Sequence, residues 1–405
     1  MSFSPLAGVR VIDLTSSLAG PYCTQILAAL GADVVKIEHP GRGDEARAWG
    51  PRFFEGGSVM FFAANAGKRS LALDVKAPRG REALLRLTGS AGVFIQSLRP
   101  GTAERIGLGP DELRSHNERL VYCSIGAFGR TGPLADHPGY DPLMQAAAGI
   151  ISVTGEPDRP GVRVGTSLID QTTGMWAALA ILACLHDGGG RTIDLSLYES
   201  ALALLPYQLA GVLAGGEPPA RHGTAFPLIA PYEVFATSDG ELMIAAANDR
   251  LFQAFAAALG RPDLASDARF VTNPLRVEHR QELVPIVAEH LARERSAVWL
   301  ERLRSAGVPA APVQDLAEVA AHEQTTALGI VQELAGLKAV AAPISLDGER
   351  VRYSAPPPLL GEHSGEILAE ADYSDAEIAD LVASGTVATS PESRAQPRPD
   401  APPAG

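Results

Sequence analysis

The sequence predicts an α/β fold in which helices cover both faces of a mostly parallel β-sheet. Three observations lead to this prediction. Short runs of branched aliphatic residues alternate with helix-like segments over roughly the first half of the chain, their spacing is typical of strand–helix–strand units, and 46% of the 405 residues are hydrophobic. The length also suggests two or three domains, at about 150 residues each.

The strands and helices of this first part follow one another in a regular order. The first strand is expected at Val9–Leu14, and Pro21 suits the first turn of the next helix, which ends at Gly31. Further strands are expected at Asp33–Glu38, Val93–Gln96, Leu120–Ser124 and Thr192–Ser196. Further helices are expected near Arg79–Leu87, Asp111–His116, Asp141–Ile150, Asp170–His186 and Tyr198–Val212.

A connection that contains Gly and Pro, Gly215–Pro231, precedes a region with a different pattern. A β-hairpin is expected at Tyr232–Thr237 and Glu241–Ala246. After it we expect helices near Arg250–Gly260, Gln281–Arg293 and Ala297–Ala306 and a strand at Val308–Val313. This pattern predicts a large domain over residues 1–215, a smaller α/β domain over 216–330 and a return to the large domain over 331–371.

The end of the chain has two predicted parts. Ser374 and Glu377 have the spacing of a capping box, which predicts a terminal helix over residues 372–385 that stops at Gly385. Residues 386–405 are rich in Pro and are expected to be a disordered tail.

Composition argues against several classes of protein. The net charge is −13 and the longest run of basic residues is Lys68-Arg69, so we expect no nucleic-acid partner. Three widely spaced cysteines make neither a disulfide framework nor a zinc motif, and no histidine pairs with another ligand at metal spacing. The N-terminus does not resemble a signal peptide, and no apolar stretch reaches about 20 residues. We therefore expect a soluble, cytoplasmic protein without a membrane partner or a metal.

Polar residues are expected to gather where parallel strands end, because ligands of open α/β sheets bind beyond the carboxyl ends of the strands. The loops after Leu14, Glu38, Gln96 and Ser124 carry several cations, which suit an anionic ligand such as a phosphorylated cofactor. The candidates in these loops are Ser17, His39, Arg42, Arg99, Arg105, Arg130, His137, Tyr140 and Asp141. The loop after the first strand lacks G-x-G-x-x-G, so a nicotinamide or flavin cofactor is not expected.

Asp170 allows two interpretations. It precedes a strongly apolar helix, so residue type alone favours an ordinary helix N-cap. The alternative is a functional carboxylate at a helix start, partly stripped of water, with Gly174 one turn later leaving room for a ligand.

A series of motifs narrows the choice. They are Leu6–Leu14, Ala19–Pro21, Leu30–Glu38, Asn65–Ser70, Arg99–Gly101, Phe128–Pro133, Pro138–Asp141, Asp170–Gly174, Ile193–Ser200 and Gly307–Pro309. In this order they resemble the class III CoA-transferases, a superfamily that includes carnitine/CoA-transferases, formyl-CoA transferase and α-methylacyl-CoA racemase. The resemblance covers about residues 5 to 365.

The resemblance implies a fold, an activity and a set of site residues. The fold would be a large domain with a Rossmann-like sheet and a smaller α/β domain, in an interlocked homodimer. The activity would be transfer of CoA from an acyl-CoA to a carboxylic acid, with Asp170 as nucleophile, no tightly bound cofactor and no metal. Coenzyme A would contact Leu18, Ala19, His39, Leu73, Lys76, Ser97, Leu98, Arg99, Arg105, His137, Tyr140 and Asp141.

Departures from the family pattern leave alternatives open. Gln96-Ser97-Leu98 stands where the family often has Glu-Asn-Phe, and the bulkier segment Arg221–Ile229 stands where formyl-CoA transferase has a glycine-rich flap, which argues against formate and oxalate as substrates. An acyl-CoA α-epimerase is the first alternative, although Tyr140 replaces the histidine of the racemase branch. A non-catalytic CoA-binding protein is the second.

Overall fold

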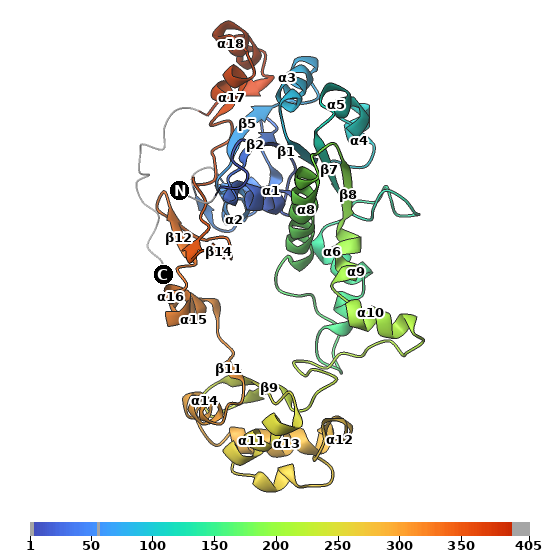
Figure 1. The fold of residues 1–405 in the computed structure, drawn as a ribbon, viewed down its shortest axis with the longest axis vertical. Coiled ribbons are helices and arrows are strands. Elements are labelled where there is room, and N and C mark those ends of the chain that lie inside the picture. The colour runs from blue at the N-terminus through green and yellow to red at the C-terminus, as the bar shows by residue number, and fades with distance from the viewer. Residues whose placement is uncertain (1–3, 55–56, 391–405) are drawn as a thin grey trace. The chain divides into compact units, whose positions relative to one another are not determined.

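The computed structural model describes residues 4–54 and 57–390, which form two compact units (Figure 1). The large unit comprises residues 4–148, 165–209 and 328–390, and the small unit comprises residues 149–164 and 210–327. The small unit thus starts and ends a few residues earlier than the second domain expected from the sequence. It also contains the segment 149–164, which we expected in the large domain.

A seven-stranded sheet forms the centre of the large unit. Its strands are β1 (Arg10–Leu14), β2 (Asp33–Glu38), β5 (Arg69–Leu73), β6 (Val93–Gln96), β7 (Val121–Gly126), β8 (Thr192–Ser196) and β16 (Val387–Ala388). The spatial order is β16-β5-β2-β1-β6-β7-β8, with β16 antiparallel to β5 and the other neighbours parallel. The chain builds outward from β1 through β2 to β5, then returns to β6 on the other side of β1. This reversal leaves a crevice beyond the carboxyl ends of β1 and β6, where ligands of such sheets bind.

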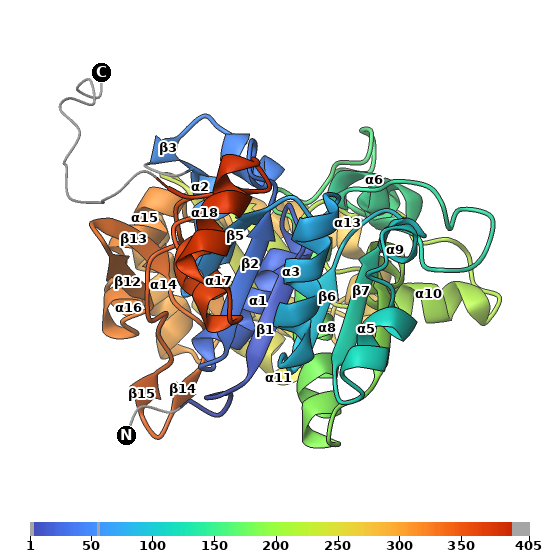
Figure 2. The same ribbon diagram turned by 90° about the horizontal axis from the view of Figure 1, so that it is seen from above.

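Helices cover both faces of this sheet, as predicted (Figure 2). Ile12 faces an apolar core that includes residues of α3, α5, α17 and α18. The next residue, Asp13, points the other way and accepts a hydrogen bond from Thr24 of α1. On that second face α8 packs along α1 and against β7 and β8. The bounds are α1 (Ala19–Ala29), α3 (Pro78–Gly89), α5 (Pro110–His116), α8 (Leu168–His186), α17 (Ser364–Glu370) and α18 (Asp375–Ala383).

Shorter elements connect or flank these layers. Those of the large unit are η1 (Glu45–Ala48), α2 (Val59–Asn65), α4 (Thr102–Arg105), α6 (Asp141–Ala147) and α9 (Leu197–Ala203), with the strand pairs β3 (Phe53–Phe54) and β4 (Gly57–Ser58), β12 (Val331–Leu334) and β13 (Leu337–Val340), and β14 (Ser345–Leu346) and β15 (Glu349–Arg350). Helix α10 (Pro206–Leu213) crosses the boundary into the small unit.

The small unit has its own sheet and its own core. The predicted hairpin is confirmed as β9 (Tyr232–Ala236) and β10 (Glu241–Ala245), and β11 (Ala310–Pro312) pairs with β10. The helices are α7 (Ile150–Val153), α11 (Asp249–Ala258), η2 (Pro262–Ala265), α12 (Asn273–Glu278), α13 (Arg280–Leu291), α14 (Ser296–Ser305), α15 (Leu316–Ala321) and α16 (Glu323–Ala327). Phe252, Phe255 and Trp299 are among the buried residues that join the helices to the sheet.

Two expectations about elements were wrong. The helix expected at Tyr198–Val212 is two helices, α9 and α10, because Pro206 cannot continue the hydrogen bonding of α9. Residues 386–390 do not belong to a disordered tail: β16 pairs with β5, the N–H of Asp74 donates to the Thr386 carbonyl at 2.9 Å, and Val387 is buried. Residues 391–405 lie outside the described residues. The capping box of Ser374 and Glu377 on α18 is confirmed.

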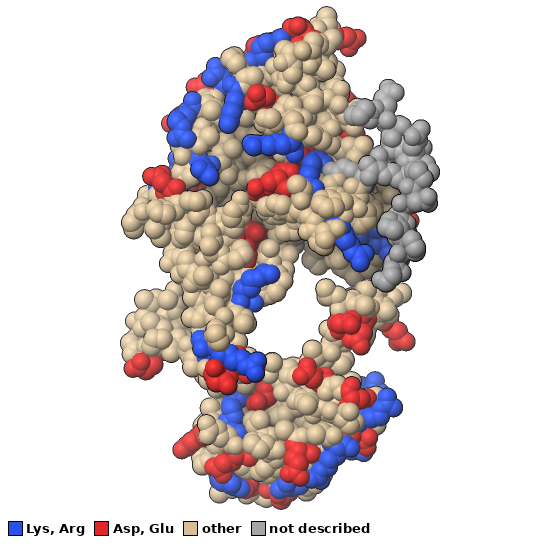
Figure 3. All heavy atoms as spheres, turned by 180° about the vertical axis from the view of Figure 1, so that it is seen from behind, with Lys and Arg blue, Asp and Glu red and all other residues tan. Residues whose placement is uncertain are grey.

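Two surface properties bear on possible partners. Within residues 4–54 and 57–390, α8 is the one helix long and apolar enough to cross a membrane by length and composition, a test that core helices also pass. On the face drawn in Figure 3, Lys and Arg side chains are interspersed with Asp and Glu. The absence of membrane and nucleic-acid partners therefore stays a prediction.

Candidate active site

A cavity of about 450 Å³ lies in the crevice at the carboxyl ends of β1 and β6. Its walls come from the loops after β1, β6 and β7, from Glu45 at the start of η1 and from the first residues of α1, α8 and α9, all within the large unit. The lining residues are Ser16, Ser17, Ala19, Gly20, Glu45, Ser97, Leu98, Arg99, Pro100, Ile125, Gly126, Ala127, Asp136, His137, Pro138, Gly139, Tyr140, Asp170 and Leu197. The cavity therefore lies at the edge of the sheet where the sequence predicted a ligand site.

The loop from β1 to α1 forms one wall without a G-x-G-x-x-G motif. Ser17 has a φ of 67°, which is unusual for a residue with a side chain, and its N–H donates to Asp44 Oδ1 at 3.0 Å. The N–H of Ser16 donates to Ser97 Oγ at 3.2 Å, which ties this loop to the loop after β6. A Cβ at Gly20 would lie 2.4 Å from the Thr15 side chain, so this tight turn requires a glycine.

Beneath this loop lies a cluster of buried charges. Lys68 Nζ contacts Asp13 Oδ2 at 3.1 Å and the Pro21 carbonyl at 2.8 Å. Lys36 Nζ contacts Asp44 Oδ2 at 2.8 Å and the Thr15 carbonyl at 3.1 Å. The two ammonium groups thus bind backbone carbonyls on either side of the loop. Each of these four charges has a partner of opposite sign, so the cluster supports the wall of the cavity and leaves no free charge for a ligand.

Electrostatics agrees with this supporting role. Burial raises the pKa of Asp13, but Lys68, Lys36 and the hydroxyls of Thr15 and Thr24 outweigh it and lower the pKa to about 2. Burial lowers the pKa of Lys68 to about 8 because Asp13 offsets only part of the desolvation. Asp13 therefore stays ionised at neutral pH.

Asp170 lies in the first turn of α8 but does not cap it. It is the third residue of the helix, after Leu168 and Ile169, and the N-cap residue Ser167 makes no side-chain hydrogen bond to the helix. Asp141 supplies the cap instead: its Oδ2 accepts from the N–H of Ile169 at 2.7 Å and from the N–H of Asp170 at 3.3 Å. Interpreting Asp170 as an N-cap was therefore wrong, because a carboxylate from another helix takes that place.

The carboxylate of Asp170 is available for chemistry. It lines the cavity and is partly exposed, and the described residues offer it no hydrogen-bond or ion-pair partner. Burial, and next the nearby negative charge of Asp141, raise the pKa of Asp170 to about 7. A perturbed carboxyl group in a cavity at a sheet's ligand edge is a strong candidate for a catalytic residue.

Gly174 has a different role from the one expected. A Cβ at position 174 would lie 2.6 Å from the Ala19 carbonyl oxygen and 3.1 Å from the Cys23 nitrogen. The glycine therefore permits α8 to cross α1 closely, and does not make room for a ligand beside Asp170.

Glu45 forms part of the opposite wall and was not predicted as a site residue. Its carboxylate accepts hydrogen bonds from the hydroxyl of Ser17 and from the phenol of Tyr140, the latter at 3.4 Å. The negative charge of Glu45 and, to a lesser extent, burial raise the pKa of Tyr140, and Trp49 packs edge-on against the Tyr140 ring. We expected cations around an anionic ligand, so a carboxylate such as Glu45 was not expected in the wall of this cavity.

The structure brings eight of the predicted residues together around this cavity. They are Ser17, Ala19, Ser97, Leu98, Arg99, His137, Tyr140 and Asp170. Arg99 is exposed, and within the described ranges its guanidinium has no acidic partner. Gln96, which stands where the family often has glutamate, connects β6 to its neighbours. Its amide nitrogen donates to Ser124 Oγ at 2.8 Å, and its amide oxygen accepts from the N–H of Leu98 at 2.6 Å.

The other predicted residues lie near this edge without lining the cavity. His39 follows β2, and Leu73 and Lys76 lie at and after the end of β5. His39, Lys76 and Arg105 are exposed, whereas Leu18, Leu73 and Asp141 are buried. Their contact with CoA stays a prediction.

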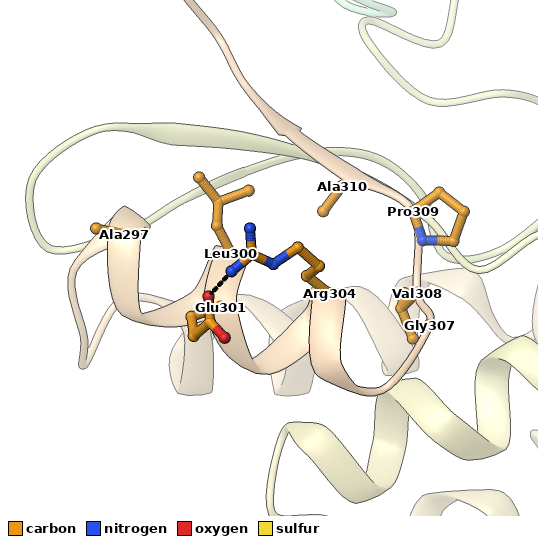
Figure 4. A pocket seen from close by; sticks show the side chains of 8 residues that line it. All are labelled: Ala297, Leu300, Glu301, Arg304, Gly307, Val308, Pro309 and Ala310. Carbon is orange, nitrogen blue, oxygen red and sulfur yellow. Dashed lines mark hydrogen bonds and ion pairs between the residues drawn. The ribbon is translucent and has the colours of Figure 1, made fainter.

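Two other hollows contain charged side chains that already pair with each other or with neighbouring residues. One of about 380 Å³ adjoins the cavity and shares Leu98 and Arg99 with it, and its Arg130 pairs with Glu104 and Asp194. The other, of about 660 Å³, lies on the small unit between α14 and the chain leading to β11 (Figure 4). Its charged groups, Glu301 and Arg304, pair with each other, so neither is left for a ligand.

The segment Arg221–Ile229, which stands where formyl-CoA transferase has its glycine-rich flap, belongs to the small unit. Its carboxyl-terminal half is held by side chains from two helices. Arg280 donates to the carbonyls of Phe226 at 2.7 Å and Ile229 at 2.6 Å, and Asn273 donates to the Leu228 carbonyl at 2.9 Å. The residues before Phe226 are held as well, because the N–H of Gly223 donates to the Gly155 carbonyl at 2.9 Å and the Thr224 hydroxyl accepts from the N–H of Val234 at 3.1 Å.

Comparison with known proteins identifies the relatives of this chain. The family model of CoA-transferase family III matches residues 6–364. Succinyl-CoA:glutarate CoA-transferase of Mus musculus is 38% identical over 95% of this chain and 91% of its own length, and succinate–glutarate CoA-transferase of Agrobacterium fabrum is 39% identical over 90% and 95%. The crystal structure of a CAIB/BAIF family protein from Brucella suis superimposes with a TM-score of 0.82 at 38% identity, covering 91% of this chain and 100% of that one.

Proposed function

Because the chain belongs to family III of the CoA-transferases, we propose that it moves CoA from an acyl-CoA donor to a carboxylic acid through covalent intermediates on Asp170. The observation that carries this proposal is the carboxylate of Asp170, which lines the cavity, has no partner among the described residues and has a pKa raised to about 7.

The reaction proceeds by two exchanges. The Asp170 carboxylate attacks the thioester carbonyl of the donor, which forms a mixed anhydride and releases CoA thiolate. The thiolate then attacks the aspartyl carbonyl, which breaks the anhydride, releases the donor acid and leaves an aspartyl-CoA thioester. The acceptor acid repeats both steps in reverse and leaves as its CoA thioester, with Asp170 restored. A carboxylate nucleophile is required because it must leave about as readily as the acids it exchanges.

The raised pKa of Asp170 helps the first step. An ordinary aspartate and a thiol have pKa values of about 3.9 and about 8.5, so expelling a thiolate with an aspartate is uphill by roughly 4.6 pKa units. With the pKa of Asp170 at about 7, the difference falls to roughly 1.5 units. Burial therefore makes Asp170 a stronger nucleophile, at the cost of a smaller ionised fraction near neutral pH.

Cations at the same edge of the sheet support binding of the CoA phosphates. Arg99 lines the cavity, and Lys76 and Arg105 are exposed on or near the neighbouring loops. Guanidinium and ammonium groups bind phosphates by charge-assisted hydrogen bonds, so these residues are the proposed anchors. CoA itself is a substrate here and not a resident cofactor.

The acids exchanged are proposed to be short dicarboxylates. Two relatives that align over nearly the whole chain are named for succinate and glutarate.

We also propose that the protein acts as a homodimer in the cytoplasm. Helix α8 leaves Met175, Trp176 and Leu179 about half exposed, and such apolar patches mark protein interfaces. A second copy of the chain is the proposed occupant, and light scattering at micromolar concentration should give twice the chain mass. The three cysteines are unpaired, as is usual in a reducing compartment.

The proposed function is tested by trapping the intermediate. Incubation with succinyl-CoA alone should add CoA to Asp170, seen by peptide mass spectrometry and removed by hydroxylamine. Asp170→Asn should form no adduct and lose turnover by a factor on the order of 10³ or more, whereas Asp136→Asn, which alters another carboxylate lining the same cavity, should still form it. Turnover of Asp170→Asn close to wild type, or deuterium incorporation at the α-carbon in D2O without an acceptor acid, would refute the proposal in favour of another chemistry.

A further inference from the structure

The N-terminus of α8 is capped by a residue from another helix. Ser167, the N-cap residue, contributes no side-chain hydrogen bond. The Asp141 carboxylate, 28 positions earlier in the chain, accepts from the N–H of Ile169 at 2.7 Å and from the N–H of Asp170 at 3.3 Å. These are the second and third N–H groups of the helix, which a local cap would otherwise bind.

Asp141 is itself held firmly in place. It is the first residue of α6, it is only 2% exposed, and its Oδ1 accepts from Gln145 Nε2 at 2.6 Å. Gln145 is completely buried one turn further along α6. Both oxygens of Asp141 are therefore occupied by protein donors, and the side chain has little surface left for a ligand.

Three other helices of the large unit are capped by a residue at their own N-terminus. Ser58 caps α2, Ser196 caps α9 and Ser374 caps α18, each through its own side chain and an N–H three residues later. Helix α8 differs in that the residue binding its first N–H groups belongs to the loop–helix segment that also supplies Tyr140 to the cavity wall. The position of the Asp170 backbone is thus tied to that wall.

We propose that Asp141 is a positioning residue for the reaction: by capping α8 from α6, it fixes the backbone that carries Asp170 and places a fixed negative charge beside the reacting carboxylate. This proposal rests on the proposed function of Asp170.

The electrostatic consequence follows from the short distance between the two residues. After burial, the charge of Asp141 is the second cause of the raised pKa of Asp170. The other titratable and charged groups that line the same cavity are Glu45, Arg99, Asp136, His137 and Tyr140, and none of them is among the causes of that shift. Removing the Asp141 charge should therefore lower the pKa of Asp170 even when the cap is kept.

Two variants separate the charge from the cap. Asp141→Asn keeps one side-chain oxygen for the α8 N–H groups and removes the charge, and its amide can donate to the Gln145 oxygen once the Gln145 amide turns over. Asp141→Ala removes both. Ser374→Ala, which removes the N-cap of α18 in the same unit, is the matched control for loss of a helix cap elsewhere.

Two measurements on the full chain decide the proposal. The pH dependence of carbodiimide labelling at Asp170, followed by peptide mass spectrometry, reports its ionisation without any need for turnover. The midpoint should lie near pH 7 in the wild type and in Ser374→Ala, and at least half a pH unit lower in Asp141→Asn. The rate of adduct formation with saturating succinyl-CoA should fall at least 10-fold in Asp141→Ala, less in Asp141→Asn, and remain unchanged in Ser374→Ala.

The outcomes are separable from those of the proposed function. An unchanged labelling midpoint in Asp141→Asn, or an Asp141→Ala protein that forms the adduct at the wild-type rate, would overturn the proposal. If Asp141→Ala does not fold, the midpoint of Asp141→Asn still decides. A wild-type protein that forms no adduct would refute the role of Asp170 as nucleophile, while the shift of the labelling midpoint would still support the coupling between the two carboxylates.

Discussion

Gly174 on α8 lies directly against Ala19 on α1: a β-carbon at position 174 would stand 2.6 Å from the Ala19 carbonyl oxygen. Helix α1 begins just after the loop that forms one wall of the cavity, and α8 carries Asp170. The close crossing of these two helices therefore sets the distance between two walls of the active site.

Gly174→Ala is expected to lower the free energy of unfolding by about 1–3 kcal/mol, because the added methyl group meets backbone atoms that have no room to move aside. Urea denaturation measures the change. Gly89→Ala is the control, since a β-carbon at this exposed residue of α3 meets no atom within 4 Å and should leave stability unchanged or slightly raised. Equal stabilities of the two variants would contradict the tight crossing.

Lys68→Met should destabilise the protein by about 3–5 kcal/mol, because it leaves the fully buried carboxylate of Asp13 without its nearest cation. The double variant Lys68→Met/Asp13→Asn should regain part of this loss, since no uncompensated charge remains. Equilibrium unfolding of the single and double variants gives the coupling energy. A double variant no more stable than Lys68→Met would show that the ammonium acts through the Pro21 carbonyl and not through the ion pair.

Asp170→Asn should stabilise the protein at pH 8 but not at pH 4. The pKa of Asp170 is about 7 in the folded protein and about 3.9 when unfolded, so between these values the folded state holds a proton that the unfolded state has lost. Stability contributed by this group therefore falls as pH rises from about 4 to about 7. Because the side chain is partly exposed, we expect a gain on the order of 1–2 kcal/mol at pH 8.

Thermal unfolding at the two pH values measures this effect, and Asp33→Asn is the control of opposite sign. Although burial raises the pKa of Asp33, Arg69 and Arg10 lower it, so its ionised form stabilises the fold. Asp33→Asn should therefore lose stability at pH 8. A gain for Asp170→Asn that is the same at pH 4 and pH 8 would mean that its pKa is not raised.

Truncation after Gly385 should destabilise the protein by about 2 kcal/mol or more relative to truncation after Ser390. The five residues between these ends contribute the buried side chain of Val387 and the pairing of β16 with β5. Comparing the two truncations isolates residues 386–390 from the rest of the tail. Identical melting temperatures would show that β16 adds nothing to the sheet.

Much of the large sheet could be predicted from the sequence because its central strands are buried on both faces. Such strands are rich in apolar residues, and β2 and β6 agree with the prediction to the residue. The edge strand β8 also agrees to the residue, although most of its residues are exposed or partly exposed. Strand β5 was missed because it begins at Arg69, beside Lys68. Lys68 pairs with Asp13 and Arg69 with Asp33, both from other strands, so the local sequence does not predict that these two cations are paired.

The site was predictable only in part for a similar reason. The predicted strand ends put Arg99, His137 and Tyr140 at the correct edge of the sheet. For Asp170, only the resemblance to a family favoured a catalytic residue over an ordinary helix N-cap. The cap supplied by Asp141 depends on a contact across 28 residues, and Glu45 contradicts simple charge matching. The Asp141 cap and the place of Glu45 both depend on contacts between residues far apart in the chain, and residue spacing in a single sequence does not predict such contacts.

The pairing of β16 with β5 also has a consequence for synthesis on the ribosome. Strand β5 is made early, whereas its outer neighbour β16 is nearly the last described segment to be made. The small unit, whose main segment ends at residue 327, can collapse on its own core while the edge of β5 is still open. A growing chain thus carries an unpaired strand edge for most of its synthesis, which makes this edge the natural place for a chaperone to bind and for nascent chains to associate wrongly.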